Sequence, residues 1–309
     1  MLVREEDLFD YSLTGGLSAK NQLNRLAAEH IEKSTGKKYA QKNPDITFAL
    51  DLWHNRPSAL PSPIFISASY RKLSRAYCQH LWVCGNCRGR GCNKCEGKGE
   101  NYPSVEGAIK SAFGPIFGAS DVHLHASGRE DVDVIMEGNG RPCVIEIVHP
   151  TKRNGDMNAA AASLSAAHPI ELSSLSICSP SFVESVCTSH FEKTYRVWID
   201  AGREVKKEEL SAIVSSAPIT LHQRTPARVA QRRADLVRKR RVLEISCLEH
   251  KSNLFTLDLR TDAGTYIKEF VHGDNGRTVP SISSILSSPS TCKQLNVIHI
   301  HDDFILTLG

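Results

Sequence analysis

One acidic stretch combines the residue types of a carboxylate-dependent site with the setting of a loop. Residues 128–133 read Gly-Arg-Glu-Asp-Val-Asp. They follow an alternating run at 122–125, which is typical of a strand, and precede Gly-Asn-Gly at 138–140, which predicts a tight turn. Side chains at such strand ends are held by a rigid scaffold and often carry chemistry. The alternative interpretation is a surface hairpin whose charges are solvated.

Four cysteines form a second candidate site. Cys84 and Cys87 make one C-x2-C pair, and Cys92 and Cys95 make another shortly after it. Zn²⁺ held tetrahedrally by four thiolates is the usual outcome of this spacing, and a site without an open position is structural. A redox dithiol is the alternative. Two adjacent pairs favour a structural zinc site.

A basic segment is the third candidate. Residues 222–241 contain eight Lys or Arg and a single acid. Thr225-Pro226 resembles a helix start, with a cap followed by proline. In a helix, Arg224, Arg228 and Arg232 would project from one face, and arginine suits bidentate phosphate contacts. A solvated helix face is the alternative, but the acids that usually interleave one are nearly absent. We therefore expect contact with the backbone of a folded RNA.

Two histidine pairs need a separate interpretation. His123 and His125, like His299 and His301, occupy alternate positions of expected strands. Such pairs bind metal when further ligands are near, but the sequence shows no third ligand. Ordinary strand faces are the favoured interpretation.

The elements that must position these residues alternate between helices and strands. Helical spacing at 20–31 ends in a Ser-Thr-Gly stop, and a turn and strand follow at 43–52. A mixture of this kind predicts an α+β protein with a mixed or antiparallel central sheet and flanking helices. Further helices are expected at 105–117, 156–167 and 181–190, and further strands at 171–178, 194–199, 242–247 and 254–259.

Composition sets broad limits. The chain has 309 residues, 40% of them hydrophobic, and its 38 basic against 34 acidic residues give a net charge of +4. No apolar run approaches the roughly 18 residues that a membrane span needs. Residues 1–7 are acidic and lack the apolar core of a signal peptide. We therefore expect a soluble, cytoplasmic protein whose ten cysteines are thiols or metal ligands.

Five windows of the chain carry a family resemblance: residues 69–75, 126–147, 223–235, 263–269 and 273–278. In this order they resemble the motifs of the archaeal and eukaryotic type of tRNA pseudouridine synthase, the family that acts on uridines 54 and 55 of the TΨC arm. Several ordered motifs are far more specific than one. The resemblance implies the pseudouridine synthase fold with its catalytic cleft, isomerase activity, tRNA as the partner, and no membrane association.

The resemblance also implies a mechanism. The family breaks the C1′–N1 bond of uridine, turns the base over and joins C5 to C1′, without a nucleotide or other catalytic cofactor. Asp131 matches the catalytic aspartate, and Asp133 is its competitor, expected to cap the turn. Tyr195 matches the tyrosine that stacks on uracil and is implicated in removal of the C5 proton. Lys268 matches the cation that pairs with the catalytic carboxylate and keeps it ionised.

The remaining implied contacts concern the substrate. Ile267 and Leu295 match apolar walls against the base, and Arg129 matches a residue that replaces or contacts the flipped nucleotide. The chain departs from the family at Ile135, where arginine is usual, and at Cys143, where phenylalanine is usual, so the range of target uridines stays open. The predicted substrate-binding set is Arg129, Ile267, Leu295, Arg224, Arg228 and Arg232.

The N-terminal part resembles the end of a THUMP domain, an RNA-binding module, in shortened form. We therefore predict an accessory region at 1–103, with the cysteine knuckle at 84–95, and a catalytic domain at 104–309. The knuckle also resembles two of the CxxCxGxG repeats of a co-chaperone zinc domain, so a zinc interaction module is one alternative. The other is a catalytically degenerate, zinc-containing RNA-binding protein.

Overall fold

The computed structural model describes residues 18–231 and 234–302, and the chain divides into two units between Ser62 and Pro63. The first unit contains helix α1 (Ala19–Thr35) and an antiparallel pair of strands, β1 (Ile46–Asp51) and β2 (Arg56–Pro61). Gly36 ends α1 in the left-handed conformation, with φ 68°. The helix, its stop and the first strand agree with the predictions.

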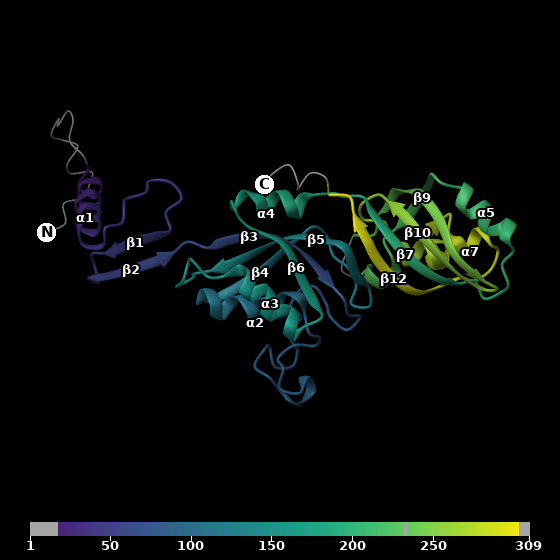
Figure 1. The fold of residues 1–309 in the computed structure, drawn as a ribbon, viewed down its shortest axis with the longest axis horizontal. Helices are drawn as coiled ribbons and strands as arrows, with labels where there is room; N and C mark the ends of the chain where they lie inside the picture. Colours follow the sequence, from purple (N-terminus) through teal and green to yellow (C-terminus); the bar gives the residue numbers. More distant parts are fainter. Residues whose placement is uncertain (1–17, 232–233, 303–309) are drawn as a thin grey trace. The chain divides into compact units, whose positions relative to one another are not determined.

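The second unit is built on one ten-stranded sheet (Figure 1). Its order is β11-β8-β9-β10-β7-β12-β5-β3-β6, and β4 pairs with β5 beside this path. Neighbouring strands are antiparallel except β12 and β5, which are parallel. The strands are β3 (Ile64–Lys72), β4 (Asp121–Ala126), β5 (Ile135–Val148), β6 (Ile170–Cys178), β7 (Lys193–Asp200), β8 (Ile219–Arg224), β9 (Val237–Lys251), β10 (Leu254–Thr261), β11 (Thr278–Val279) and β12 (Thr291–Ile300).

Short helices cover this sheet. Figure 1 shows α2 and α3 side by side below its β3–β6 half, and α4 above it. Within residues 18–231 and 234–302, no helix is both long and apolar enough to cross a bilayer. The helices of this unit are α2 (Val105–Phe117), α3 (Met157–Ala167), α4 (Ser181–Thr188), α5 (Lys207–Ser215), α6 (Ile267–His272) and α7 (Ile282–Ile285), with 3₁₀ turns η2 (Asn93–Cys95), η3 (Ala227–Val229) and η4 (Gly273–Gly276). The predicted mixed α+β architecture is confirmed.

Strand β3 lies inside the large sheet. It pairs with β5 on one side and β6 on the other, and its alternate residues from Ile64 to Lys72 are buried. The sequence prediction places this strand in an accessory region ending at residue 103. The structure divides the chain 41 residues earlier, between 62 and 63, because β3 completes the sheet and the cysteine knuckle belongs to the same unit.

The Gly-Asn-Gly at 138–140 is not a hairpin turn, contrary to the prediction. It lies within the 14-residue β5 as an irregularity, with φ 65° at Gly138 and 79° at Gly140. On β3, Tyr70 pairs with Arg141 and Lys72 with Met136, so β5 carries extra residues there. A Cβ at Gly140 would lie 3.0 Å from the carbonyl oxygen of Tyr70, so close strand approach requires glycine.

The irregularity divides one edge of β5 between two partners. Residues 143–148 of β5 pair with β4, and Ile135 and Met136 pair with β12. The loop from β4 to β5 therefore leaves the sheet where β4 and β12 share this edge. That loop contains the acidic stretch.

Candidate functional site

Two cations, the buried Lys72 and the half-buried Arg75, hold the acidic loop by its backbone. Lys72 is fully buried, and its Nζ donates to the carbonyl oxygens of Val132 at 2.8 Å and Asp131 at 3.2 Å. Arg75 Nη1 donates to the carbonyl oxygen of Asp133 at 2.6 Å. Burial lowers the pKa of Lys72, while the nearby carboxylates partly oppose this shift. The loop presents its side chains from a fixed backbone.

Glu130, a buried residue of the same loop, anchors the loop to the protein core. Its carboxylate lies 2.8 Å from Arg141 Nη2 and accepts the hydroxyl hydrogen of Tyr70 at 3.0 Å. Gln79 Nε2 donates to the Tyr70 oxygen at 2.8 Å and to the carbonyl oxygen of Gly128 at 2.9 Å. Glu130, Arg141, Tyr70 and Gln79, here called the buried clamp, are all at most 6% exposed. Sequence patterns did not single out the clamp.

Asp131 lies between two cations. Arg228 Nη1 is 3.0 Å from its Oδ2 and donates to its Oδ1 at 3.1 Å. Lys268 Nζ is 3.4 Å from Oδ2. The Asp131 side chain is 40% exposed, so a substrate atom can approach it. A carboxylate oriented in this way suits nucleophilic or acid–base chemistry.

Lys268 lies closer to Asp133 than to Asp131. Its Nζ donates to both Asp133 oxygens at 2.8 Å. Burial raises the pKa of Asp133, but Lys268 lowers it, and the net shift is downward. Lys268 therefore bridges two carboxylates, whereas the sequence interpretation paired it with Asp131 and assigned Asp133 to the turn.

Arg228 is itself held by a buried acid. Its Nε donates to Oε1 of Glu269 at 2.7 Å. Glu269 is 1% exposed, and its Oε2 has no hydrogen-bond partner among the described residues. Burial lowers the pKa of the Arg228 guanidinium. The carboxylates of Glu269 and Asp131 raise it by more, so the net shift is upward. Sequence reasoning missed Glu269, since it gave no sign that a charge beside Lys268 is buried.

Tyr195 is partly buried on β7, against the core. Burial raises the pKa of its phenol to about 12, with a smaller contribution from Glu130, so the group is neutral at physiological pH. The charges of Arg141 and Glu130 also affect this pKa, so Tyr195 lies near the buried clamp. Ile267 and Leu295 are buried at 3% and 7% exposure, and Arg129 is exposed in the acidic loop.

The basic segment is not the predicted helix. Arg224 ends strand β8, and Arg228 lies in the short turn η3. Pro226 precedes that turn, and the Thr225 hydroxyl donates to the carbonyl oxygen of Ala234 at 2.6 Å instead of capping a helix. Arg224 pairs with Asp235 at 2.7 Å, whereas Arg228 pairs with Asp131 and Glu269. Arg232 lies outside the described residues.

The two departures from the family pattern lie on β5. Ile135 begins the strand and pairs with Asn296 of β12. Cys143 is buried, and burial raises the pKa of its thiol to about 12, so it is an inert core residue.

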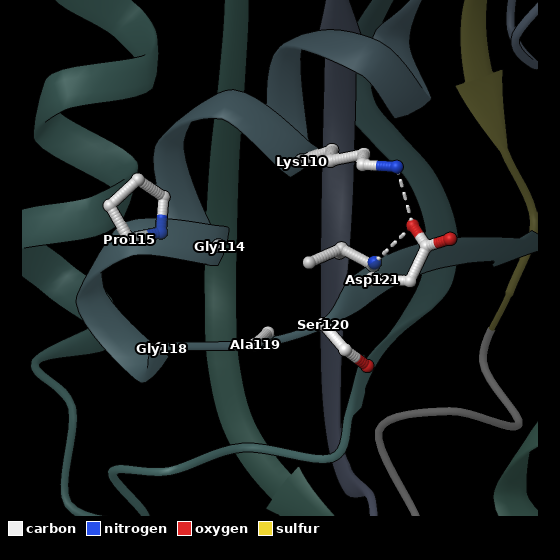
Figure 2. Close-up of a pocket in the computed structure, with 8 residues that line it drawn as sticks. Lys110, Gly114, Pro115, Gly118, Ala119, Ser120 and Asp121 are labelled. Atoms are coloured by element: carbon white, nitrogen blue, oxygen red, sulfur yellow. Dashed lines mark hydrogen bonds and ion pairs between the residues drawn. The ribbon is translucent and has the colours of Figure 1, made fainter.

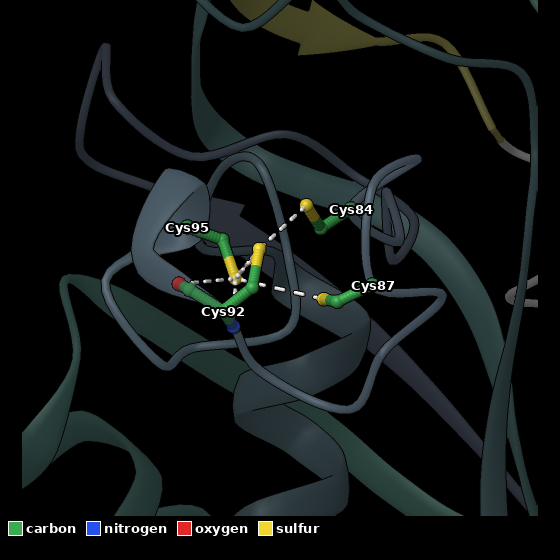
Figure 3. Close-up of side chains that lie close together, drawn as sticks. All are labelled: Cys84, Cys87, Cys92 and Cys95. Carbon is green, nitrogen blue, oxygen red and sulfur yellow. Dashed lines mark hydrogen bonds between the residues drawn. The ribbon is translucent and has the colours of Figure 1, made fainter.

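Four sulfurs meet in the cysteine knuckle (Figure 3). All lie within 4.8 Å of one another, with Cys84–Cys92 at 4.0 Å, Cys87–Cys95 at 3.7 Å and Cys92–Cys95 at 3.8 Å. A tetrahedral zinc with Zn–S bonds of about 2.3 Å requires sulfur separations of about 3.8 Å. The donor set therefore fits a closed metal site.

Backbone packing supports the knuckle. The amide of Gly99 donates to Cys95 Sγ at 3.2 Å, and a Cβ at Gly99 would lie 2.5 Å from the carbonyl oxygen of Gly89. A Cβ at Gly91 would likewise lie 2.6 Å from the carbonyl oxygen of Gly97. The glycines let the two cysteine turns cross closely.

His123 and His125 lie in β4 and His299 lies in β12, whereas His301 directly follows the end of β12 at Ile300. His125 Nε2 lies 2.8 Å from Glu146, and His301 Nε2 lies 2.9 Å from the Thr194 hydroxyl. Among the described residues, the four cysteines are the group of three or more potential ligands close enough to hold a metal.

A cavity of about 340 Å³ lies at the end of α2 (Figure 2). Lys110 and Asp121, paired at 2.7 Å, line it together with glycine and alanine. It lies at the start of β4, whereas the acidic loop follows the end of that strand. The cavity contains none of the predicted site residues.

Comparison with known proteins identifies similar sequences. A family model described as Pus10, C-terminal, matches residues 65–301. The tRNA pseudouridine synthase Pus10 of Methanothrix thermoacetophila is 36% identical over 284 residues, which are 91% of this chain and 63% of that protein. The namesake from Archaeoglobus fulgidus is 36% identical over 282 residues, covering 91% and 79%. The Methanocaldococcus jannaschii protein of the same name is 36% identical over 287 residues, which are 92% of this chain and 62% of that protein. The chain therefore spans under two thirds of the length of some relatives.

Solved structures are more distant. A crystal structure of a Cbf5-Nop10-Gar1 complex has 14% identity, covers 85% of this chain and 56% of that chain, and gives a TM-score of 0.43. The archaeal box H/ACA sRNP Nop10-Cbf5 complex also has 14% identity, covers 63% and 43%, and gives 0.36.

Proposed function

The chain belongs to the Pus10 family of tRNA pseudouridine synthases, and on that premise we propose that it is a tRNA pseudouridine synthase. It isomerises uridine to pseudouridine at position 54, position 55 or both in the TΨC arm. The carrying observation is the Asp131 carboxylate, which lies on a clamped loop within 3.0 Å of Arg228 and 3.4 Å of Lys268. The reaction needs no catalytic cofactor.

The reaction is balanced within the substrate. The C1′–N1 bond breaks, a C5–C1′ bond forms, the C5 proton leaves and N1 gains a proton. Asp131 acts at the sugar, as nucleophile or as acid–base group. The target base must leave its stack to reach that carboxylate.

The remaining residues shape the base site. Tyr195 stacks on uracil and takes part in transfer of the C5 proton as a neutral phenol. Ile267 and Leu295 form apolar walls, and Arg129, exposed beside Asp131, fills or contacts the space of the flipped nucleotide. Arg224 and Arg232 contact the RNA backbone.

The accessory parts support this role. We assign a structural Zn²⁺ to Cys84, Cys87, Cys92 and Cys95, where it would hold the knuckle together. The catalytic domain begins at Pro63, since β3 belongs to its sheet. Residues 19–61 act as a THUMP-like accessory module.

The test uses the full chain and an unmodified tRNA transcript. Pseudouridine is mapped by carbodiimide adducts that stop reverse transcription. Stops at 54 or 55 are expected, and each should vanish in a transcript with cytidine at that position. Tight tRNA binding without any stop would favour a non-catalytic RNA-binding protein.

A further inference from the structure

We propose that Glu269 is a positioning residue that fixes Arg228 against Asp131, so that Arg228 serves the catalytic carboxylate and not an RNA phosphate. This inference rests on the proposed function. It changes the role that the basic segment suggests for Arg228, and it assigns one to a buried acid outside the mechanism. Three residues from separate elements carry it: Asp131 in the acidic loop, Arg228 in η3 and Glu269 in α6.

The first step is the burial of Glu269. A carboxylate with 1% exposure is stable as an anion only beside a compensating charge. Among the described residues, that charge is Arg228, whose Nε donates to Oε1 at 2.7 Å. If Arg228 swung out to a phosphate, Glu269 would be left buried and unpaired. Glu269 therefore holds Arg228 inward.

The second step is the geometry of the guanidinium. Nε binds Glu269, while Nη1 reaches both oxygens of Asp131, at 3.0 and 3.1 Å. The planar guanidinium holds Nε and Nη1 in a fixed relative orientation, which the rotatable ammonium of lysine does not reproduce. The hydrogen bond from Arg228 Nε to Glu269 thus sets the orientation of Nη1, the nitrogen that faces Asp131.

The third step is the anchoring of the turn itself. The amide of Ala227 donates to Asp274 Oδ2 at 2.9 Å. Arg277 Nη2 donates to the carbonyl oxygen of Thr225 at 2.6 Å. Backbone bonds on both sides of Pro226 fix the segment that carries Arg228. The cation is therefore preorganised before substrate arrives.

Two consecutive residues of helix α6 consequently act on the Asp131 carboxylate, one directly and one through Arg228. Lys268 approaches Asp131 directly at 3.4 Å, and Glu269 acts through Arg228. Adjacent residues of one helical turn point in different directions. The second cation beside Asp131 is Arg228, from η3.

The test separates turnover from RNA binding. Glu269→Gln, Arg228→Lys and the uncharged Arg228→Gln are compared with Glu244→Gln, which removes an exposed glutamate paired with Arg260 at 2.9 Å. We measure the single-turnover rate of pseudouridine formation with enzyme saturating and in excess over the tRNA transcript, the Kd for that transcript, and the dependence of Kd on salt. Circular dichroism confirms folding. Should Glu269→Gln not fold, Arg228→Lys decides the question.

Glu269→Gln and Arg228→Lys should lower the saturated rate by at least about tenfold, with Kd within about twofold of wild type. Arg228→Gln should leave the salt slope unchanged, whereas losing a phosphate contact reduces it by about one. Glu244→Gln should match wild type. A wild-type rate with tighter tRNA binding in Glu269→Gln would overturn the proposal, as would a reduced slope in Arg228→Gln. A wild type that forms no pseudouridine defeats the proposed function instead, and the slope still reports on Arg228.

Discussion

Arg228 reaches Asp131 with Nη1 at 3.0 Å although the two residues are 97 positions apart in the chain. The contact crosses from η3 to the β4–β5 loop, so it forms only when the sheet has assembled. The same carboxylate lies 3.4 Å from Lys268. Asp131 is thus oriented by groups that were not adjacent in sequence.

Lys268 should influence both acids of the loop. Lys268→Met removes the charge that bridges Asp131 and Asp133 while keeping an unbranched side chain. We expect a loss of about 10²–10³-fold in the saturated rate of pseudouridine formation, because Asp131 then loses one of the two cations that contact it. Lys293→Met, which removes a lysine paired with Asp200 at 3.1 Å, is the matched control. Equal rates for Lys268→Met and wild type would contradict the assignment.

Tyr195 should act as a neutral group over the whole useful pH range. Burial raises its phenol pKa to about 12, so the proton stays on until well above physiological pH. Loss of activity between pH 7 and 10 should therefore be the same in wild type and Tyr195→Phe. Tyr195→Phe keeps the ring and should lower the rate about 10²-fold if the hydroxyl assists proton transfer. An alkaline limb below pH 10 that disappears in Tyr195→Phe would refute this.

Periodicity predicted the elements whose information is local. Helix α2 begins and ends at the predicted residues. The Ser104 side chain caps its start by accepting from the Gly107 amide, and Gly118 ends the helix in the left-handed conformation. The sequence motif also pointed to Asp131 and Lys268, which the structure brings together. Neither result required knowledge of distant packing.

Long-range packing explains what was mispredicted. Gly138 and Gly140 look like a turn, but they relieve close contacts between β5 and its neighbours. The four-residue spacing of Arg224 and Arg228 looks helical, although Arg224 is paired within a strand. Glu269 cannot be recognised as buried from its neighbours in sequence, because β12 and η3 supply its surroundings.

The buried clamp should contribute strongly to stability. Arg141→Met leaves Glu130 without its ion-pair partner in a buried site, and losing one member of such a pair costs about 3–5 kcal/mol. Urea unfolding at pH 7 should report a decrease of this size. Arg71→Met, which breaks an exposed pair with Glu171, should cost under about 1 kcal/mol. Similar losses for both variants would show that the clamp does not hold the loop.

Zinc should depend on the knuckle alone. Elemental analysis of undenatured wild type is expected to find about one zinc per chain. Cys87→Ser should lose the metal and the protection of amides at 84–99 from hydrogen exchange, because metal binding and local folding are coupled. Cys187→Ser, at an exposed thiol on α4, should retain both. Zinc retained at full occupancy in Cys87→Ser would disprove the assignment.

The two loop carboxylates provide the most direct test of the central claim. Asp131→Asn and Asp133→Asn are compared on the same tRNA transcript, at saturating enzyme, by mapping pseudouridine at positions 54 and 55. The account predicts a rate below about one thousandth of wild type for Asp131→Asn, with tRNA binding intact. Asp133→Asn should remain measurably active, because it changes only a partner of Lys268. Full activity in Asp131→Asn, or complete loss confined to Asp133→Asn, would contradict the assignment of Asp131 as the catalytic carboxylate.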